Sequence, residues 1–230
     1  MNIFPPADLI ALGLFVFAWG GYALALEWNE RGKDSLNARM HRFREVWMQR
    51  ALERDVRIID TQIMGSLQNG TAFFASTTLL AIGGVLSLLR SSSETLAMVA
   101  DLPFAIATTR TQWEVKVVGL VIIFVYAFFK FAWSYRLFNY AAILLGAMPP
   151  REAFGTPEGD SHVRKVTGMI ESAGRHFNRG QRAFFFALGY LGWFAGPYAL
   201  MVATVATVAV MWRRQFISQS RRALDETEPS

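Results

Sequence analysis

The sequence predicts an all-α membrane protein: a bundle of four transmembrane helices, with helices extended into the cytoplasm and amphipathic helices at the interface. The first observation is residues 183–212, a stretch of 30 residues without a charged side chain. A helix in water keeps one face polar, and about 20 apolar residues cross a bilayer. The second is that residues 9–26 are also uncharged, and the third is a hydrophobic content of 53%. The whole chain, 1–230, is expected to be a single membrane domain.

Four stretches are expected to span the membrane, at about 7–27, 70–90, 116–136 and 183–212. Pro5 and Pro6 suit the start of the first helix. A cleavable signal peptide normally has a Lys or Arg before its apolar stretch, and none precedes this one. The first helix is therefore expected to be retained as a membrane span. Lys130 interrupts the third span, and Gly196 with Pro197 is expected to kink the fourth.

Two charged segments between the spans, about 33–66 and 136–182, are expected to be helical and cytoplasmic. Apolar residues recur in the first segment at helical spacing, which predicts an amphipathic helix on the membrane surface or on a partner helix. Residues 216–230 are polar and are expected to form a flexible tail.

Basic residues predict the orientation. The two long segments, 27–70 and 136–182, carry 8 and 7 Lys or Arg residues, against 3 in residues 90–116 and none before the first span. Because cytoplasmic loops are rich in Lys and Arg, both long segments are expected to be cytoplasmic and both termini outside, in the inner membrane of a bacterium. Four arginines near the C-terminus oppose this orientation: Arg213, Arg214, Arg221 and Arg222.

Lys130 is the most unusual polar residue in the predicted spans, because burying an ammonium group in hydrocarbon is costly. At matching depth we expect Ser76 and Thr77 on the second span and Tyr190 on the fourth. One interpretation is an ion or proton path, or a site for an anionic head group. The other is a lysine whose ammonium group reaches the cytoplasmic interface.

A second polar cluster is expected where the helices leave the membrane on the cytoplasmic side. It consists of Arg57, Asp60, Asn69, Arg136, Asn139, Asn178, Arg179 and Arg182. A charge network that ties the helix extensions together and a substrate site are both consistent with these residues.

Small residues predict helix contacts. Gly83 and Gly84 lie in the second span, and Gly189, Gly192 and Gly196 recur along the fourth. Glycine allows helix backbones to approach closely, so these faces are expected to pack within the chain or across a dimer.

Several kinds of chemistry lack support in the sequence. The chain has no cysteine, and its three histidines lie in the charged segments. It contains no HExxH, GxSxG or P-loop pattern and no carboxylate dyad, so no catalytic residue, metal or cofactor is expected. Its arginines are not interleaved with aromatic residues as in single-strand binding proteins, so no nucleic-acid partner is expected.

Four strings resemble the bacterial "domain of unknown function 599" family: Ser66–Thr77, Phe131–Tyr140, Gly146–Pro149 and Asn178–Trp193. The resemblance extends over about residues 47–218. It implies a four-span membrane protein and lends no catalytic or binding residues.

Three functions remain open. The first is a non-enzymatic, oligomeric scaffold or accessory subunit of a membrane complex, with other copies or other membrane proteins as partners. The second is an oligomeric small channel or transporter with a polar site around Lys130. The third is a protein that binds or modifies lipid head groups, with membrane lipids as its partners.

Overall fold

The computed structural model describes residues 3–30, 36–90 and 109–216, and these residues are helical apart from short connections. Their elements are α1 (Pro6–Glu30), α2 (Leu36–Glu53), α3 (Ile58–Arg90), α5 (Arg110–Gly146), the 3₁₀ turn η1 (Arg151–Ala153), α6 (Pro157–Tyr190), α7 (Gly192–Ala195) and α8 (Pro197–Phe216). The predicted all-α class is therefore confirmed. The predicted tail lies, apart from Phe216, outside the described residues.

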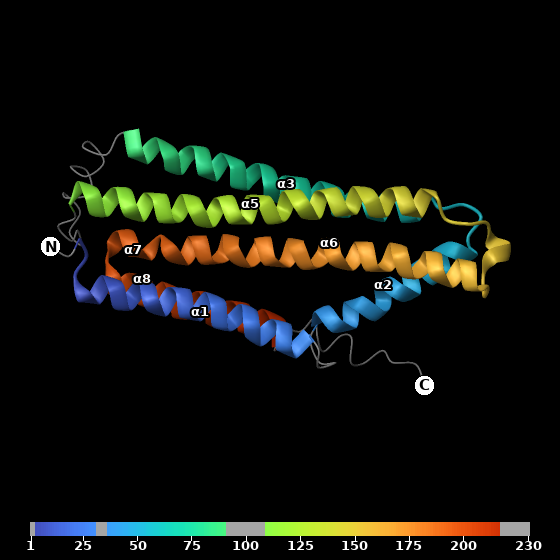
Figure 1. The fold of residues 1–230 in the computed structure, drawn as a ribbon, viewed down its shortest axis with the longest axis horizontal. Coiled ribbons are helices and arrows are strands. Elements are labelled where there is room, and N and C mark those ends of the chain that lie inside the picture. Colours follow the sequence, from blue (N-terminus) through green and yellow to red (C-terminus); the bar gives the residue numbers. More distant parts are fainter. Residues whose placement is uncertain (1–2, 31–35, 91–108, 217–230) are drawn as a thin grey trace.

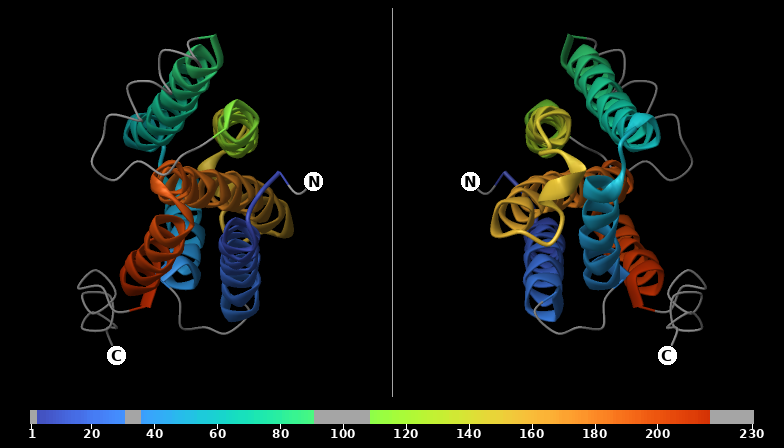
Figure 2. Two further views of the ribbon diagram at one scale, coloured as in Figure 1. Left: turned by 90° about the vertical axis from the view of Figure 1, so that its left-hand side faces the viewer. Right: turned by 90° about the vertical axis from the view of Figure 1, so that its right-hand side faces the viewer.

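The helix α6 lies at the centre of the molecule. Figure 1 shows the long helices running side by side, and the end-on views in Figure 2 place α6 between two pairs. The helices α3 and α5 form one pair, and α1 and α8 form the other. The shorter α2 packs on α6 near the end remote from α7.

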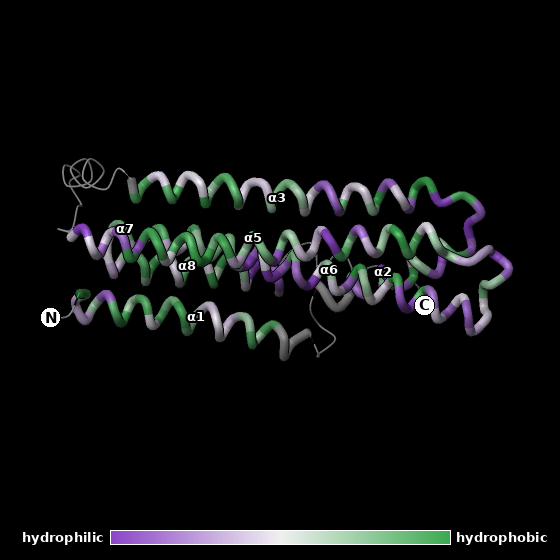
Figure 3. The backbone as a smooth tube through the Cα atoms, turned by 45° about the horizontal axis from the view of Figure 1, so that its top comes forward, coloured by the Kyte–Doolittle hydropathy of each residue, from purple (hydrophilic) through white to green (hydrophobic). Residues whose placement is uncertain are grey.

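Three helices are long and apolar enough to cross a membrane: Pro6–Leu26 of α1, Ile58–Leu89 of α3, and all of α5. At 1.5 Å per residue, the 33 residues of α3 and the 37 of α5 extend about 50 and 55 Å, whereas the hydrocarbon core is about 30 Å thick. Both helices therefore extend well beyond such a layer. Figure 3 shows hydrophobic residues concentrated toward the α7 end of the molecule.

The predicted fourth span is wrong, because residues 183–212 do not form one helix. The helix α6 ends at Tyr190, α7 makes a single turn, and the chain reverses into α8. Gly196 has φ 129°, a conformation open to glycine, and Pro197 has no N–H to continue the ladder of hydrogen bonds. The pair that was expected to kink a span instead helps to reverse it.

Contacts along α6 and α8 establish that they form an antiparallel hairpin. A Cβ atom on Gly192 would lie 2.8 Å from the Ala199 carbonyl oxygen, and one on Gly189 would lie 2.7 Å from the Thr207 hydroxyl. At the far end, the Arg214 guanidinium lies over the Phe185 ring. The start of α1 therefore lies at the α7 end of the bundle, and the end of α8 lies beside the end of α1, partway along the bundle. The prediction that both termini share one side of the membrane depended on a single crossing, and the hairpin removes that basis.

The described residues form three hydrophobic clusters along α5 and α6, and the smallest, made of Ala127, Phe131 and Ala183, lies between the other two. The first lies toward α7 and includes Phe15, Phe124, Phe186 and Leu200. The second lies toward η1 and brings residues of α2, α3, α5 and α6 together, among them Met48, Met64, Leu145, Val166 and Ile170.

The predicted helical segment 33–66 is divided between two helices. The helix α2 ends at Glu53, and α3 begins at Ile58 and continues without a break to Arg90. Of the apolar residues that formed the predicted amphipathic pattern, Leu52 is buried, whereas Met40 and Phe43 are 38% and 49% exposed.

Candidate functional site

A cavity of about 190 Å³ lies between α1, α6 and α8, where the apolar parts of α1 and α8 end. We call it the boundary cavity. Its lining residues are Tyr22, Leu26, Asn178, Gln181, Arg182, Phe185, Met211, Arg214 and Gln215. The described lining contains two guanidinium groups and three side-chain amides, which are groups that can hold an anion.

Helical spacing places the polar groups of this cavity. Asn178 and Arg182 lie four residues apart on α6 and so share a face. Arg214 comes from the last turn of α8, with its guanidinium 5.4 Å from the centre of the Phe185 ring. The Nε2 atom of Gln215 is buried and makes no hydrogen bond within the part of the chain that the structure describes. This unpaired amide is a donor available to a bound group.

A second cavity, of about 280 Å³, lies on the other flank of α1, next to α5 and α6. It is lined by Trp19, Ala23, Tyr126, Arg179 and Arg182. Arg182 thus lines both cavities.

Lys130 does not face the three partners predicted for it. Its ammonium group lies over the ring of Tyr126, 5.1 Å from the ring centre. The hydroxyl of Tyr190 instead lies against Gly119, about 16 Å away from Lys130 along α5 at 1.5 Å per residue. Ser76 is exposed on α3, and Thr77 is partly exposed. The predicted polar site around Lys130 is therefore not assembled.

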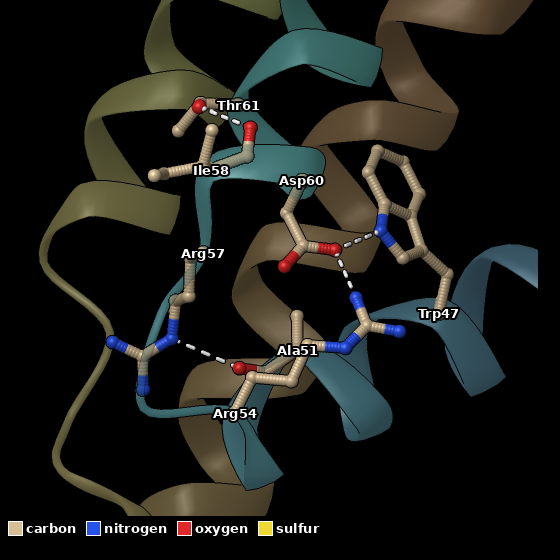
Figure 4. A network of polar contacts seen from close by, with 7 residues as sticks. All are labelled: Trp47, Ala51, Arg54, Arg57, Ile58, Asp60 and Thr61. Atoms are coloured by element: carbon tan, nitrogen blue, oxygen red, sulfur yellow. Dashed lines mark hydrogen bonds and ion pairs between the residues drawn. The ribbon is translucent and has the colours of Figure 1, made fainter.

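The predicted boundary cluster of eight residues separates into several groups. Asp60 is fully buried and accepts hydrogen bonds from Trp47 Nε1 (2.7 Å) and from an Arg54 guanidinium nitrogen (2.5 Å), as Figure 4 shows. Arg57 donates to the carbonyl oxygens of Ala51 (2.9 Å) and Pro149 (3.1 Å). These bonds tie the turn between α2 and α3 to the end of α5, far from the boundary cavity.

The remaining members also separate. Arg136 donates to the Tyr140 hydroxyl one turn along α5, at 2.7 Å. Asn139 accepts a 2.8 Å hydrogen bond from Gln68 on α3, and Asn69 is exposed. Of the eight, those on α6 come together at the two cavities: Asn178, Arg179 and Arg182.

Sequence reasoning missed a buried polar contact at the α7 end. The Asp8 carboxylate accepts a 2.5 Å hydrogen bond from Trp193 Nε1, and Lys116 Nζ donates to the Trp193 carbonyl oxygen at 2.9 Å. Asp8 and Lys116 are 7% and 5% exposed. A signal was present, because each charge directly adjoins an uncharged stretch, but their meeting depends on the unpredicted hairpin.

The two groups of glycines that were predicted to pack against helices differ in their surroundings. Gly189 and Gly192 pack within the chain against α8. Around Gly83 and Gly84, by contrast, an added Cβ would meet nothing within 4 Å.

Both of these open glycines belong to an exposed face of α3. We call it the α3 outward face, and its exposed residues follow the helical repeat: Ile59, Gln62, Ile63, Ser66, Asn69, Gly70, Phe73, Ser76, Leu80, Gly83, Gly84 and Ser87. None of them is charged. In the most apolar stretch of α3 only 6% of the residues are buried, compared with 39% in that of α5.

No group of three or more His, Cys, Asp or Glu side chains in residues 3–30, 36–90 and 109–216 is arranged to hold a metal ion. A family model described as "Protein of unknown function, DUF599" matches residues 10–220. No curated protein and no solved structure matches the chain.

Proposed function

The chain belongs to the DUF599 family of proteins of unknown function, and we propose that it is a non-enzymatic membrane scaffold whose copies associate through the α3 outward face. The observation that carries the proposal is the composition of that face. It is exposed over the length of α3, uncharged, and rich in small residues.

Small residues on this face favour a helix partner over lipid. Within the apolar part of α3 this face includes Ser76, which is polar, and glycine at 83 and 84. Glycine and serine let two helix backbones approach closely, and van der Waals packing between them is what drives association in lipid.

The part of α3 beyond the membrane also favours a protein partner. If residues 70–90 fill the hydrocarbon core, about 12 residues at 1.5 Å each extend about 18 Å into water. In this part Ile59 and Ile63 are 65% and 42% exposed. Lipid tails cannot cover them there, and burying them against protein is favourable.

A second copy of the chain fits this face. The partner needs an uncharged surface that continues from the membrane into water over about 50 Å, the length of α3 at 1.5 Å per residue. Another α3 in the same orientation supplies that surface, and a two-fold axis along the membrane normal brings equivalent residues together.

We propose five crossings for each copy: α1, α3, α5, the end of α6, and α8. The hairpin of α6 and α8 packs along α1, through Phe15 with Phe186 (ring centres 5.6 Å apart) and Tyr22 with Trp212 (6.5 Å). An odd number of crossings puts the two termini on opposite sides, and we propose that the N-terminus is outside and the C-terminus in the cytoplasm. The arginines Arg213 and Arg214 then lie on the same side as the basic helices, as the positive-inside rule favours.

Disulfide cross-linking tests the association, and the natural chain contributes no cysteine. Leu80 and Leu79 are neighbouring leucines, 77% and 56% exposed. They lie about 100° apart around α3 at 3.6 residues per turn, and only Leu80 lies on the α3 outward face. Leu80→Cys in native membranes is expected to give covalent dimers on oxidation, and so is Ser66→Cys outside the hydrocarbon.

Leu79→Cys is the matched control and is expected to remain monomeric under the same oxidation. Equal dimer yields from Leu79→Cys and Leu80→Cys would indicate random collisions and contradict the proposal. A strictly monomeric mass for the natural chain in mild detergent, together with no cross-link at either test position, would also contradict it.

A further inference from the structure

We infer that the boundary cavity is a binding site for a phosphate group, carried by an anionic phospholipid or by a soluble phosphate ester. This goes beyond the proposed scaffold role and does not depend on it. The cavity brings α1, α6 and α8 together on the side of the bundle remote from the α3 outward face.

The polar groups of the cavity match a phosphate. Arg182 and Arg214 reach it from two different helices. A guanidinium group offers planar paired donors that fit phosphate oxygens, and such charge-assisted hydrogen bonds are stronger than neutral ones. The Gln215 amide nitrogen adds a buried donor without a hydrogen bond in the described ranges. An entering anion therefore meets donors from two helices.

The level of the cavity suits a lipid head group. Tyr22 and Leu26 lie in the last part of the apolar stretch of α1, and Met211 lies just before Arg213 and Arg214 on α8. A phosphate bound there would lie where hydrocarbon gives way to water. The apolar side chains of Leu26, Phe185 and Met211 would then contact the glycerol and the first carbons of the acyl chains.

The second cavity strengthens the positive potential. Arg179 and Arg182 line it, and Lys130 lies over Tyr126 in the same wall. Two cavities that share Arg182 thus place cationic side chains on two flanks of α1. At partial burial these charges act on an anion through a lower dielectric than that of water.

Native mass spectrometry of the detergent-solubilised chain tests the site. The probes are phosphatidylglycerol, neutral phosphatidylcholine, and glycerol 3-phosphate as the soluble ester. One equivalent of phosphatidylglycerol is expected to be retained, and phosphatidylcholine much less. Arg214→Gln is expected to weaken retention roughly tenfold, because it removes a charge-assisted hydrogen bond.

Arg213→Gln is the matched control. Arg213 is the preceding residue of α8, carries the same charge, and lines an apolar groove between α1 and α8 in place of the boundary cavity. The Arg213→Gln variant is expected to change the retention of phosphatidylglycerol less than twofold. Both arginines are exposed, so both variants are expected to fold, and equal melting temperatures check this.

Three outcomes separate the possibilities. Loss with Arg214→Gln alone, seen with phosphatidylglycerol, supports the site with a lipid as its ligand. The same dependence seen only with glycerol 3-phosphate supports the site with a soluble ester. Equal losses in the two variants, or equal retention of phosphatidylglycerol and phosphatidylcholine, would overturn the inference.

Discussion

The ammonium group of Lys116 on α5 donates a 2.9 Å hydrogen bond to the carbonyl oxygen of Trp193 on α7. This carbonyl lies where the chain reverses between α6 and α8, so the helical ladder around it is interrupted. The indole nitrogen of the same Trp193 donates to Asp8 on α1. One residue at the reversal thus links two other helices through buried charged groups.

We predict that Lys116→Met destabilises the chain by about 1–3 kcal/mol, the order of a hydrogen bond from a charged donor. The Trp193 carbonyl keeps its hydrogen bond from the Gly196 N–H but loses the one from the ammonium group, and the buried Asp8 loses a nearby positive charge. Thermal unfolding in detergent measures the effect. Lys165→Met removes the same charge from an exposed position of α6 and is expected to change stability little.

A double variant checks whether the two charged groups act together. If Asp8 and Lys116 are coupled through Trp193, Asp8→Asn should cost less in the Lys116→Met background than in the natural chain. Strictly additive losses would show that the two residues act independently.

The hairpin predicts where the C-terminus lies. Because α8 returns toward the end of the bundle that carries α2, a green fluorescent protein fused after Ser230 should fluoresce, as it does in the cytoplasm. Alkaline phosphatase at the same position should be inactive. The opposite pair of results would be expected if residues 183–212 formed one crossing, and would contradict the hairpin.

The uncharged stretches predicted three helices well and the fourth poorly. Residues 183–212 lack charge whichever way the chain folds, so composition alone does not separate one crossing from a hairpin. Their length did contain a signal, since 30 residues are about ten more than one crossing requires. The opposing arginines at the end of α8 were a second signal. What decides the fold is local: the positive φ of Gly196 and the missing donor of Pro197.

The candidate site was predicted in part for the same reason. Asn178, Arg179 and Arg182 were predicted to lie together, and they line the two cavities because they lie within about one turn of one helix. Their partner Arg214 comes from α8, and only the hairpin brings it to them. Ser76 and Lys130 were matched by depth, but depth does not specify which side of a helix a residue occupies.

Close packing between α5 and α6 gives another prediction. A Cβ atom on Gly119 would overlap the Tyr190 hydroxyl oxygen. Gly119→Ala is therefore expected to destabilise the chain by about 1–3 kcal/mol, as overpacked cores do. Adding Tyr190→Phe removes the overlapping oxygen and should recover part of this loss, which thermal unfolding would measure.

Gly168→Ala is the control for the Gly119→Ala variant. Gly168 lies within α6 with nothing near its Cβ position, so alanine there should stabilise the helix by up to about 1 kcal/mol. If Gly119→Ala proved equally stabilising, the contact between Gly119 and Tyr190 would be refuted.

His176 on α6 makes stability depend on pH. Partial burial lowers the pKa of its ring below the ordinary value, and the positive charges of Lys130, Arg179 and Arg175 lower it further. As pH falls below about 6.5, the unfolded chain binds a proton that the folded chain resists, so the folded state loses stability.

His176→Gln should therefore show a smaller fall in melting temperature between pH 7 and pH 5 than the natural chain. Lys130→Met should show an intermediate fall, because it removes one neighbouring charge and leaves the burial unchanged. An identical fall in all three proteins would mean that His176 does not couple protonation to folding.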